Sequence, residues 1–154
     1  MIEERLKNLN IILPQAPAPK GAYTGCVRTG NLVFISGQGP AVQGTPVYIG
    51  KVGETVSCSE AYDSARLCGI NLLTQLKANL GSLDKVKKVV SIHGYVNCTP
   101  DFFEQSLVIN GASDLMIEVF GNEKGSHSRC AVGVAALPGN ISTEVEMIVE
   151  ISDE

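Results

Sequence analysis

Residues 128–152 read SRCAVGVAALPGNISTEVEMIVEIS, in which apolar side chains alternate with polar or small ones on both sides of a Leu137-Pro138-Gly139-Asn140 turn. Alternation with period two is typical of a half-buried β-strand, because successive side chains point to opposite faces. The stretch therefore predicts two β-strands, and the proline and glycine between them predict the turn that joins them.

The first of these strands has two chemically different faces. One face carries Cys130, Val132 and Val134, which we expect in the core. The other carries Arg129 and then only small side chains: Ala131, Gly133 and Ala135. Because small side chains allow another backbone to approach closely, we expect this second face to meet a neighbouring subunit. At the edge of such a contact, the planar guanidinium of Arg129 is suited to binding both oxygens of a carboxylate.

Two helices and a strand are predicted upstream. Residues 57–60, SCSE, match a capping box, and apolar residues then recur every three to four positions until Gly81. This pattern predicts a helix of about twenty residues. The β-rich segment 85–98 predicts a strand, and Thr99-Pro100-Asp101 predicts the start of a second helix. That helix should run to about Phe120, with a weak point at 110–111, where asparagine and glycine are poor helix formers.

The N-terminal third predicts a hairpin, a loop and an arm. Segments 26–30 and 31–38 are rich in β-branched residues and flank a Thr29-Gly30-Asn31 turn, which predicts a hairpin. Residues 39–54 form a glycine-rich loop with one short strand expected near 47–49. Residues 2–9 predict a short surface helix, and the prolines that follow favour an extended arm.

This order of elements predicts an α+β fold. The sheet should be mostly antiparallel, with five to six strands, and the two main helices should cover one of its faces. A chain of 154 residues matches the usual size of one domain, so we expect a single domain over 1–154 with residues 1–10 as an N-terminal helical extension.

Composition argues against several classes of protein. The net charge is -4, with acidic and basic residues mixed, so the broad basic footprint of nucleic-acid binding is absent. No stretch approaches the length of a membrane span and the N-terminus does not resemble a secretory signal, which favours a cytoplasmic protein. The five cysteines are then expected to be reduced. With no C-x-x-C pair and two histidines, neither a metal site nor a cofactor is expected.

Four motifs in order give the chain a family resemblance. They are APKGAY at 18–23, FISGQGP at 34–40, DF at 101–102, and RCAVGVAALP at 129–138 with EVE at 144–146. Through these motifs the sequence resembles the reactive intermediate deaminase family (Rid, or YjgF), also known as L-PSP endoribonuclease. The resemblance covers almost the whole chain, and its last motif is the most specific.

The resemblance implies a chorismate-mutase-like fold and a homotrimer with three clefts between subunits. It also implies a substrate, a 2-imino acid or its enamine tautomer such as 2-aminoacrylate, and a product, the corresponding 2-oxo acid. Water adds to the C=N carbon, and the carbinolamine then expels ammonia. Such a reaction needs orientation, electrostatic stabilisation and a positioned water rather than a nucleophilic triad or a metal.

The two catalytic candidates are Arg129 and Glu144. The resemblance implies that Arg129 binds the substrate carboxylate, whereas alternation alone leaves a structural salt bridge at an interface equally possible. Glu144 is a candidate for positioning the water. The alternative interpretation is that Glu144 is an ordinary carboxylate on a strand, exposed to solvent like Glu146 and Glu150, which alternate onto the same side.

The resemblance also implies substrate-binding residues. Backbone groups at Gly37 and at Cys130, beside Arg129, would hold the reacting nitrogen, and Tyr23 would line the site. Ser36 could donate a hydrogen bond to a carboxylate, and Asn110 corresponds to an asparagine of the family's second helix. Apart from the resemblance, Tyr23 is equally an ordinary half-buried aromatic residue.

Three functions remain open. The first is an imine or enamine deaminase. The second is a non-catalytic sensor that binds a small carboxylate in the same pocket. The third, an endoribonuclease, is disfavoured by the acidic charge and the scarcity of histidine.

Overall fold

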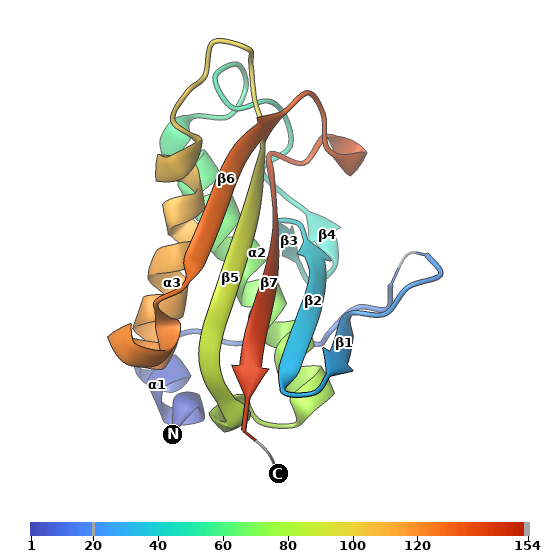
Figure 1. Cartoon of the computed structure of the whole chain (residues 1–154). Coiled ribbons are helices and arrows are strands. Elements are labelled where there is room, and N and C mark those ends of the chain that lie inside the picture. Colours follow the sequence, from blue (N-terminus) through green and yellow to red (C-terminus); the bar gives the residue numbers. More distant parts are fainter. Residues whose placement is uncertain (20, 153–154) are drawn as a thin grey trace.

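The computed structural model describes residues 1–19 and 21–152, and it consists of a mixed β-sheet with helices packed on one face (Figure 1). The main helices are α2 (Cys58–Leu80) and α3 (Gln105–Gly125), and a short helix, α1 (Ile2–Asn8), precedes them. The strands are β1 (Cys26–Thr29), β2 (Leu32–Gln38), β3 (Ala41–Val42), β4 (Thr45–Pro46), β5 (Val86–Asn97), β6 (Ser128–Val134) and β7 (Thr143–Ile151). The predicted α+β class is therefore confirmed.

The sheet has the strand order β1-β2-β7-β5-β6. All its neighbours run antiparallel except β5 and β6, which are parallel. The two strands of the 128–152 stretch are not neighbours, since β5 lies between β6 and β7. A parallel pair needs a crossover connection, and α3 provides it between β5 and β6. The strand expected near 47–49 lies instead at 45–46, where β4 pairs with β3.

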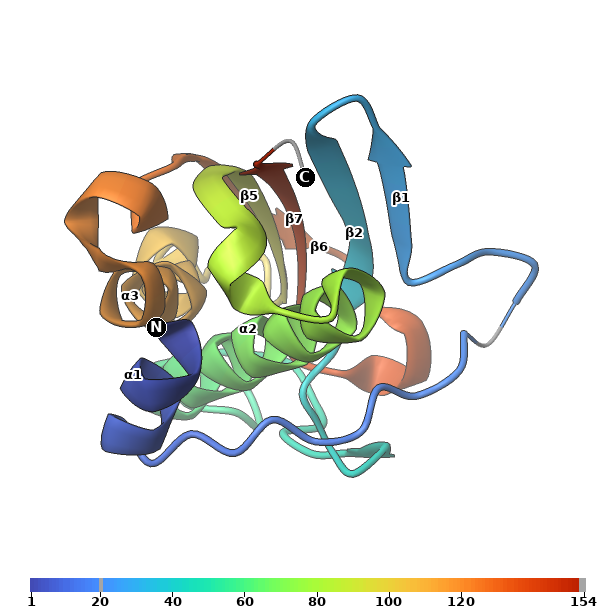
Figure 2. The same cartoon turned by 90° about the horizontal axis from the view of Figure 1, so that it is seen from below.

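Helix α2 follows the sequence pattern closely. The Ser57 hydroxyl accepts a hydrogen bond from Glu60 N at 3.2 Å, and Glu60 Oε2 accepts one from Ser57 N at 2.8 Å, so the capping box is formed. The helix ends at Gly81, whose φ of 79° suits glycine. Its apolar stripe is buried, and Figure 2 shows the helices together on one side of the sheet.

Helix α3 begins at Gln105, five residues later than predicted, and it is continuous at 110–111. Its non-helical residue is Gly121, with φ of 81°. Gly111 is a packing residue, because a Cβ there would overlap the backbone carbonyl oxygen of Tyr62 in α2. The poor helix former at this position therefore allows the two helices to approach closely.

The expected orientation of β6 is wrong. Cys130 is exposed and Val132 is 40% exposed, whereas Ala131 packs against the core. The small residues face α3: a Cβ on Gly133 would lie 2.9 Å from Gln105 Nε2 and from Cys98 Sγ. Ala131 and Gly133 thus lie beside the protein's own core and helix α3, and the cysteine and valine lie on the uncovered side. Contact of the small-residue face with a neighbouring subunit stays a prediction.

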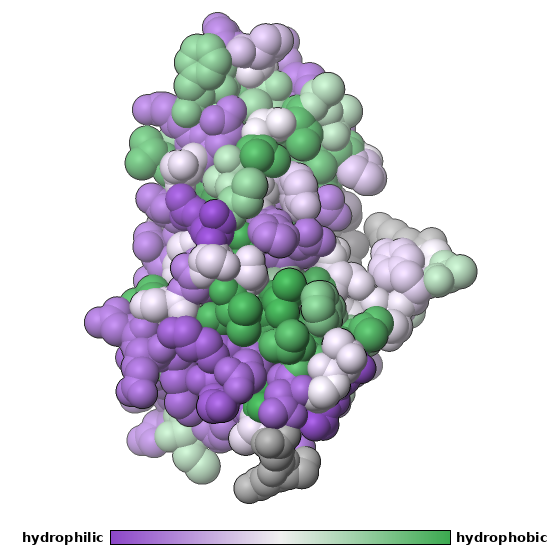
Figure 3. Space-filling view, in the orientation of Figure 1, coloured by the Kyte–Doolittle hydropathy of each residue, from purple (hydrophilic) through white to green (hydrophobic). Residues whose placement is uncertain are grey.

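That uncovered side, which we call the open face, carries a broad apolar patch over β5, β7 and β2 (Figure 3). Its exposed side chains include Val27, Leu32 and Phe34, the last being 42% exposed. None of the helices in the described part of the chain is long and apolar enough to cross a membrane.

Candidate functional site

Arg129 lies on the edge strand β6 and points along one face of α3. Its Nη1 donates to Asn110 Oδ1 at 2.7 Å and to Ser113 Oγ at 3.2 Å, and its Nη2 donates to the carbonyl oxygen of Ser106 at 3.3 Å. Positions 106, 110 and 113 follow the i, i+4, i+7 spacing of a single helix face. This spacing places all three residues on the face of α3 beside Arg129. Arg129 and Asn110, which were both predicted to belong to one site, are therefore in contact.

These contacts leave part of the guanidinium for a ligand. An arginine has five N–H donors, of which three are used, so two remain: Nε–H and one Nη2–H. These two donors have no partner among the described residues, and Nε and Nη2 lie on the same edge of the planar group, an arrangement that can match the two oxygens of a carboxylate. The helix fixes the guanidinium and presents this edge.

His127 completes the anchoring of Arg129. Its Nδ1 lies 2.7 Å from the carbonyl oxygen of Gly125, so Nδ1 must carry the proton, and its Nε2 is then free to accept from Ser113 Oγ at 2.9 Å. Burial lowers the pKa of His127, and the positive charges of Arg129 and Lys88 lower it further. A neutral His127 therefore orients the Ser113 hydroxyl so that its oxygen accepts from Arg129.

A second cluster pairs Gly37 with Glu144. The two residues lie on adjacent strands, where β2 is irregular between Ile35 and Gln38. A Cβ on Gly37 would lie 2.9 Å from Glu144 Oε1, so the carboxylate packs directly against this glycine and would have to shift for a larger residue. Burial raises the pKa of Glu144, and the negative charge of Glu146 raises it further. A raised pKa makes the protonated form of this carboxyl group more accessible than that of an ordinary glutamate, which favours a role in proton transfer.

The remaining predicted site residues occupy separate places. The Ser36 hydroxyl donates to the carbonyl oxygen of Thr24 at 2.6 Å and so fastens the arm to β2. Tyr23 is 57% exposed before β1. Cys130 lies on the open face beside His93, its register partner on β5. His93 contacts Ser91 and Glu146, at 3.2 Å and 3.1 Å.

The two clusters lie apart within one chain. Arg129 is beside α3 at the β6 edge of the sheet, whereas Glu144 and Gly37 are on β7 and β2. Strands are spaced by about 4.8 Å, so β6 and β7, which flank β5, are separated by roughly 10 Å. Glu144 also alternates onto the open face, opposite the helices, together with Glu146 and Glu150. A single chain does not bring the two catalytic candidates together.

Sequence reasoning missed Ser106, Ser113 and His127. The signal was present, because Ser106, Asn110 and Ser113 form a polar stripe at helical spacing in a segment predicted to be helical. Within residues 1–19 and 21–152, no three His, Cys, Asp or Glu side chains gather closely enough to hold a metal ion.

Comparisons with known proteins agree on one family. The family described as "YjgF/chorismate_mutase-like, putative endoribonuclease" matches residues 3–151. Protein TCP17 of Trypanosoma cruzi is 42% identical over 99% of this chain and 95% of its own. The 2-iminobutanoate/2-iminopropanoate deaminase of Dermatophagoides farinae is 31% identical over 92% of this chain and 94% of its own. The crystal structure of Atu1372, a protein with unknown function from Agrobacterium tumefaciens, has a TM-score of 0.91 at 45% identity and covers 98% of this chain and 92% of that one.

Proposed function

Because the chain belongs to the YjgF/chorismate-mutase-like family, we propose that it is a deaminase that hydrolyses 2-imino acids or their enamine tautomers to 2-oxo acids and ammonia. The observation that carries this proposal is the free edge of the Arg129 guanidinium, held against α3 by three hydrogen bonds. The deaminase from Dermatophagoides farinae, 31% identical over almost the whole chain, supports the same reaction class.

Arg129 would bind the substrate carboxylate and so place the adjacent C=N carbon at a fixed distance. A bidentate, charge-assisted pair fixes both position and orientation, which is the main requirement for an imine that already reacts with water. Asn110 and Ser113 act on Arg129 rather than on the substrate, because their contacts are to its guanidinium.

Glu144 would act on the water. It accepts a proton as water adds to the C=N carbon, and it returns a proton to the nitrogen as the carbinolamine expels ammonia. Its raised pKa supports this role, because it brings the protonated and ionised forms closer in free energy than in an ordinary glutamate. One water is consumed, one ammonia is released, and the C=N bond becomes C=O.

The proposed assembly is a homotrimer with the sites between subunits. Arg129 and Glu144 lie on different faces and different strands of one chain, so a cleft containing both would take Arg129 from one subunit and Glu144 with Gly37 from the next. The apolar open face supports such an assembly, since exposed patches of this kind mark interaction surfaces.

The test is steady-state release of ammonia from freshly generated 2-aminoacrylate. The parent protein should accelerate release, and Arg129→Ala should abolish most of the acceleration. A parent protein that binds 2-oxo acids but leaves the rate unchanged would be a sensor rather than an enzyme. RNA cleavage that survives Arg129→Ala would favour the endoribonuclease of the family's description, which the net charge of -4 argues against.

A further inference from the structure

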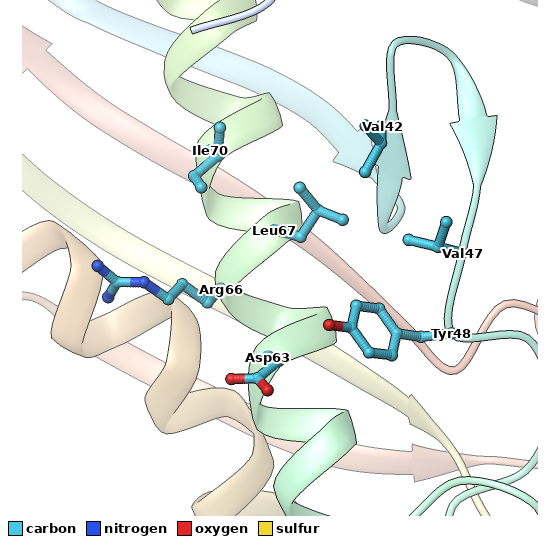
Figure 4. A pocket seen from close by; sticks show the side chains of 7 residues that line it. All are labelled: Val42, Val47, Tyr48, Asp63, Arg66, Leu67 and Ile70. Carbon is cyan, nitrogen blue, oxygen red and sulfur yellow. The ribbon is translucent and has the colours of Figure 1, made fainter. Parts of the chain in front are cut away.

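A second cleft lies on the outer side of α2, away from the sheet. It has a volume of about 410 Å³ and separates α2 from the segment that contains β3 and β4 (Figure 4). The residues that line it are Val42, Val47, Tyr48, Asp63, Arg66, Leu67 and Ile70. It shares no residue with the Arg129 cluster or with Gly37 and Glu144. Because it is on the helical side, an assembly through the open face would leave it accessible.

The walls of this cleft are apolar. Val42 and Val47 come from the β3–β4 segment and face Leu67 across the gap, and Ile70 extends the same wall along α2 (Figure 4). Val42 is exposed although it is a large apolar side chain. A hydrocarbon group placed between these walls would remove their surface from water, which favours binding.

The charge around the cleft is negative. Arg66 points away from Tyr48, and Glu118 of α3 neutralises it through two hydrogen bonds of 2.7 and 3.2 Å. Asp114, whose charge also acts on Arg66, accepts a hydrogen bond from the Tyr62 hydroxyl at 2.7 Å. Asp63 makes no hydrogen bond or ion pair within the described residues. Glu118 and Asp114 therefore act on the one guanidinium near the cleft, and the Asp63 carboxylate in the cleft lining adds a negative charge that no cation among the described residues pairs with.

Tyr48 is held at the cleft in a costly backbone conformation. Its φ is 54°, in the left-handed region that tyrosine rarely adopts. The hydrogen bond from Ser142 N to its carbonyl oxygen, at 3.1 Å, helps to keep it there. The ring projects toward the turn of α2 that carries Asp63 (Figure 4). Its hydroxyl has no hydrogen-bond partner in the part of the chain that the structure describes, so a ligand would not have to displace one.

From this combination we infer that the cleft is a binding site for a small amphipathic amine. The hydrocarbon part lies between Val42, Val47 and Leu67. The ammonium group lies at the rim, beside the Asp63 carboxylate and the ring of Tyr48, where both ion pairing and cation–π attraction favour a cation. The site is separate from the proposed deaminase site, and its ligand is not the imino acid.

Three probes of similar size and different charge test this inference. The parent protein is titrated with 2-phenylethylamine, 2-phenylethanol and 3-phenylpropanoate, and binding is followed by amide NMR shifts. The amine should bind about tenfold more tightly than the alcohol, as expected for one exposed ion pair and one exposed cation–π contact together, and the carboxylate should bind most weakly. Shifts should concentrate at 42–48 and 63–70. Equal affinity for the three probes, or shifts scattered elsewhere, would overturn the inference.

Two variants separate binding from folding. Asp63→Asn should retain alcohol binding and reduce the preference for the amine about threefold, whereas Asp101→Asn, at an exposed carboxylate outside the cleft, should leave that preference unchanged. Tyr48→Gly removes the ring and also relieves the positive φ, so the protein should be at least as stable as the parent. Its amine affinity should nevertheless fall about threefold, since an exposed cation–π contact is lost. Undiminished amine binding by a folded Tyr48→Gly protein would contradict the assignment.

Discussion

At the scale of single residues, Arg129 uses three N–H donors to hold itself against α3 and keeps two for a ligand. A lysine would carry the charge but could not reproduce the planar pair of donors. We therefore expect Arg129→Lys to lose nearly as much kcat/KM as Arg129→Ala. The loss should be about 2 to 4 kcal/mol of transition-state stabilisation, or roughly thirty- to a thousandfold, measured by ammonia release from 2-aminoacrylate.

The matched control for this substitution is Arg5→Lys, at an arginine of α1 that bonds to the backbone of Glu118 and lies outside both clusters. It should keep the parent rate. Near-normal turnover by Arg129→Lys would mean that a point charge suffices, and the bidentate geometry would then be wrong.

The lowered pKa of His127 leads to a prediction about how the free energy of unfolding depends on pH. Because folding lowers its pKa below the ordinary value of 6.5, the unfolded chain binds more protons than the folded protein between those two values. The contribution of His127 to the free energy of unfolding should therefore be complete above pH 6.5 and be lost as the pH falls through the folded pKa. In His127→Gln this titration is absent, so the parent should lose its advantage over the variant on acidification.

Urea unfolding of both proteins between pH 7.5 and 5.5, at one protein concentration, measures this difference. An advantage of the parent that stays constant across the range would show that His127 is not the neutral, buried group inferred from its contacts with Ser113 and Gly125.

At this scale, the roles that the motifs assign to site residues stay predictions, whereas the predicted orientation of β6 was wrong because it depended on packing. Arg129 and Asn110 were identified from motif positions, and the structure joins them. Cys130 was assigned to the core because alternation shows that a strand has two faces but not which face the helices cover. The bulky Val132 favoured the wrong face, whereas the face beside α3 carries Gly133, where a Cβ would lie 2.9 Å from Gln105 Nε2 and Cys98 Sγ.

At the scale of elements, Gly111 is a residue whose type is set by the packing of α3 against α2 rather than by helix propensity. Alanine is the better helix former by about 1 kcal/mol, yet a Cβ at 111 would overlap the carbonyl oxygen of Tyr62. Because backbone cannot move aside cheaply, Gly111→Ala should lower the free energy of unfolding by about 1 to 3 kcal/mol, as overpacking does. Denaturant unfolding compared with Asn79→Ala, at an exposed position of α2, provides the measurement.

The control should be as stable as the parent or slightly more stable, because it gains helix propensity without a clash. A Gly111→Ala protein that is also stabilised would mean that α2 and α3 do not approach as closely as the structure indicates.

Local patterns predicted which segments form helices and strands better than they predicted which strands are neighbours in the sheet. The capping box and apolar stripe of α2, the 26–38 hairpin and the strand at 86–97 all follow from spacing and turn chemistry. The short link at 137–140 suggested consecutive strands joined like a hairpin, but β5 lies between β6 and β7. Strand order depends on where the long crossover through α3 returns, which no local pattern encodes.

At the scale of the whole molecule, the two candidate clusters lie apart within one chain, and we propose that each is half of a site. Arg129 and its anchors lie at the β6 edge, and Gly37 with Glu144 lies two to three strands away on the other face. The small-residue face that first suggested an assembly lies beside α3. The apolar open face now carries the proposal of a trimer, and a cyclic arrangement would bring the β6 edge of one subunit to the β2 side of the next.

This arrangement predicts that two inactive variants restore activity to each other. Arg129→Ala and Glu144→Gln should each be nearly inactive alone. In trimers reassembled from an equal mixture, a site is intact when its arginine comes from a Glu144→Gln chain and its glutamate from an Arg129→Ala chain. Each condition holds for half of the subunits, so about one quarter of the sites should be intact. Ammonia release should recover to about one quarter of the parent rate after the mixed proteins are unfolded and refolded together. Mixing without refolding should leave both inactive, which controls for contamination by parent protein. If the refolded mixture stays inactive although parent protein survives the same treatment, then Arg129 and Glu144 do not meet across a subunit interface, and the proposed composite site is wrong.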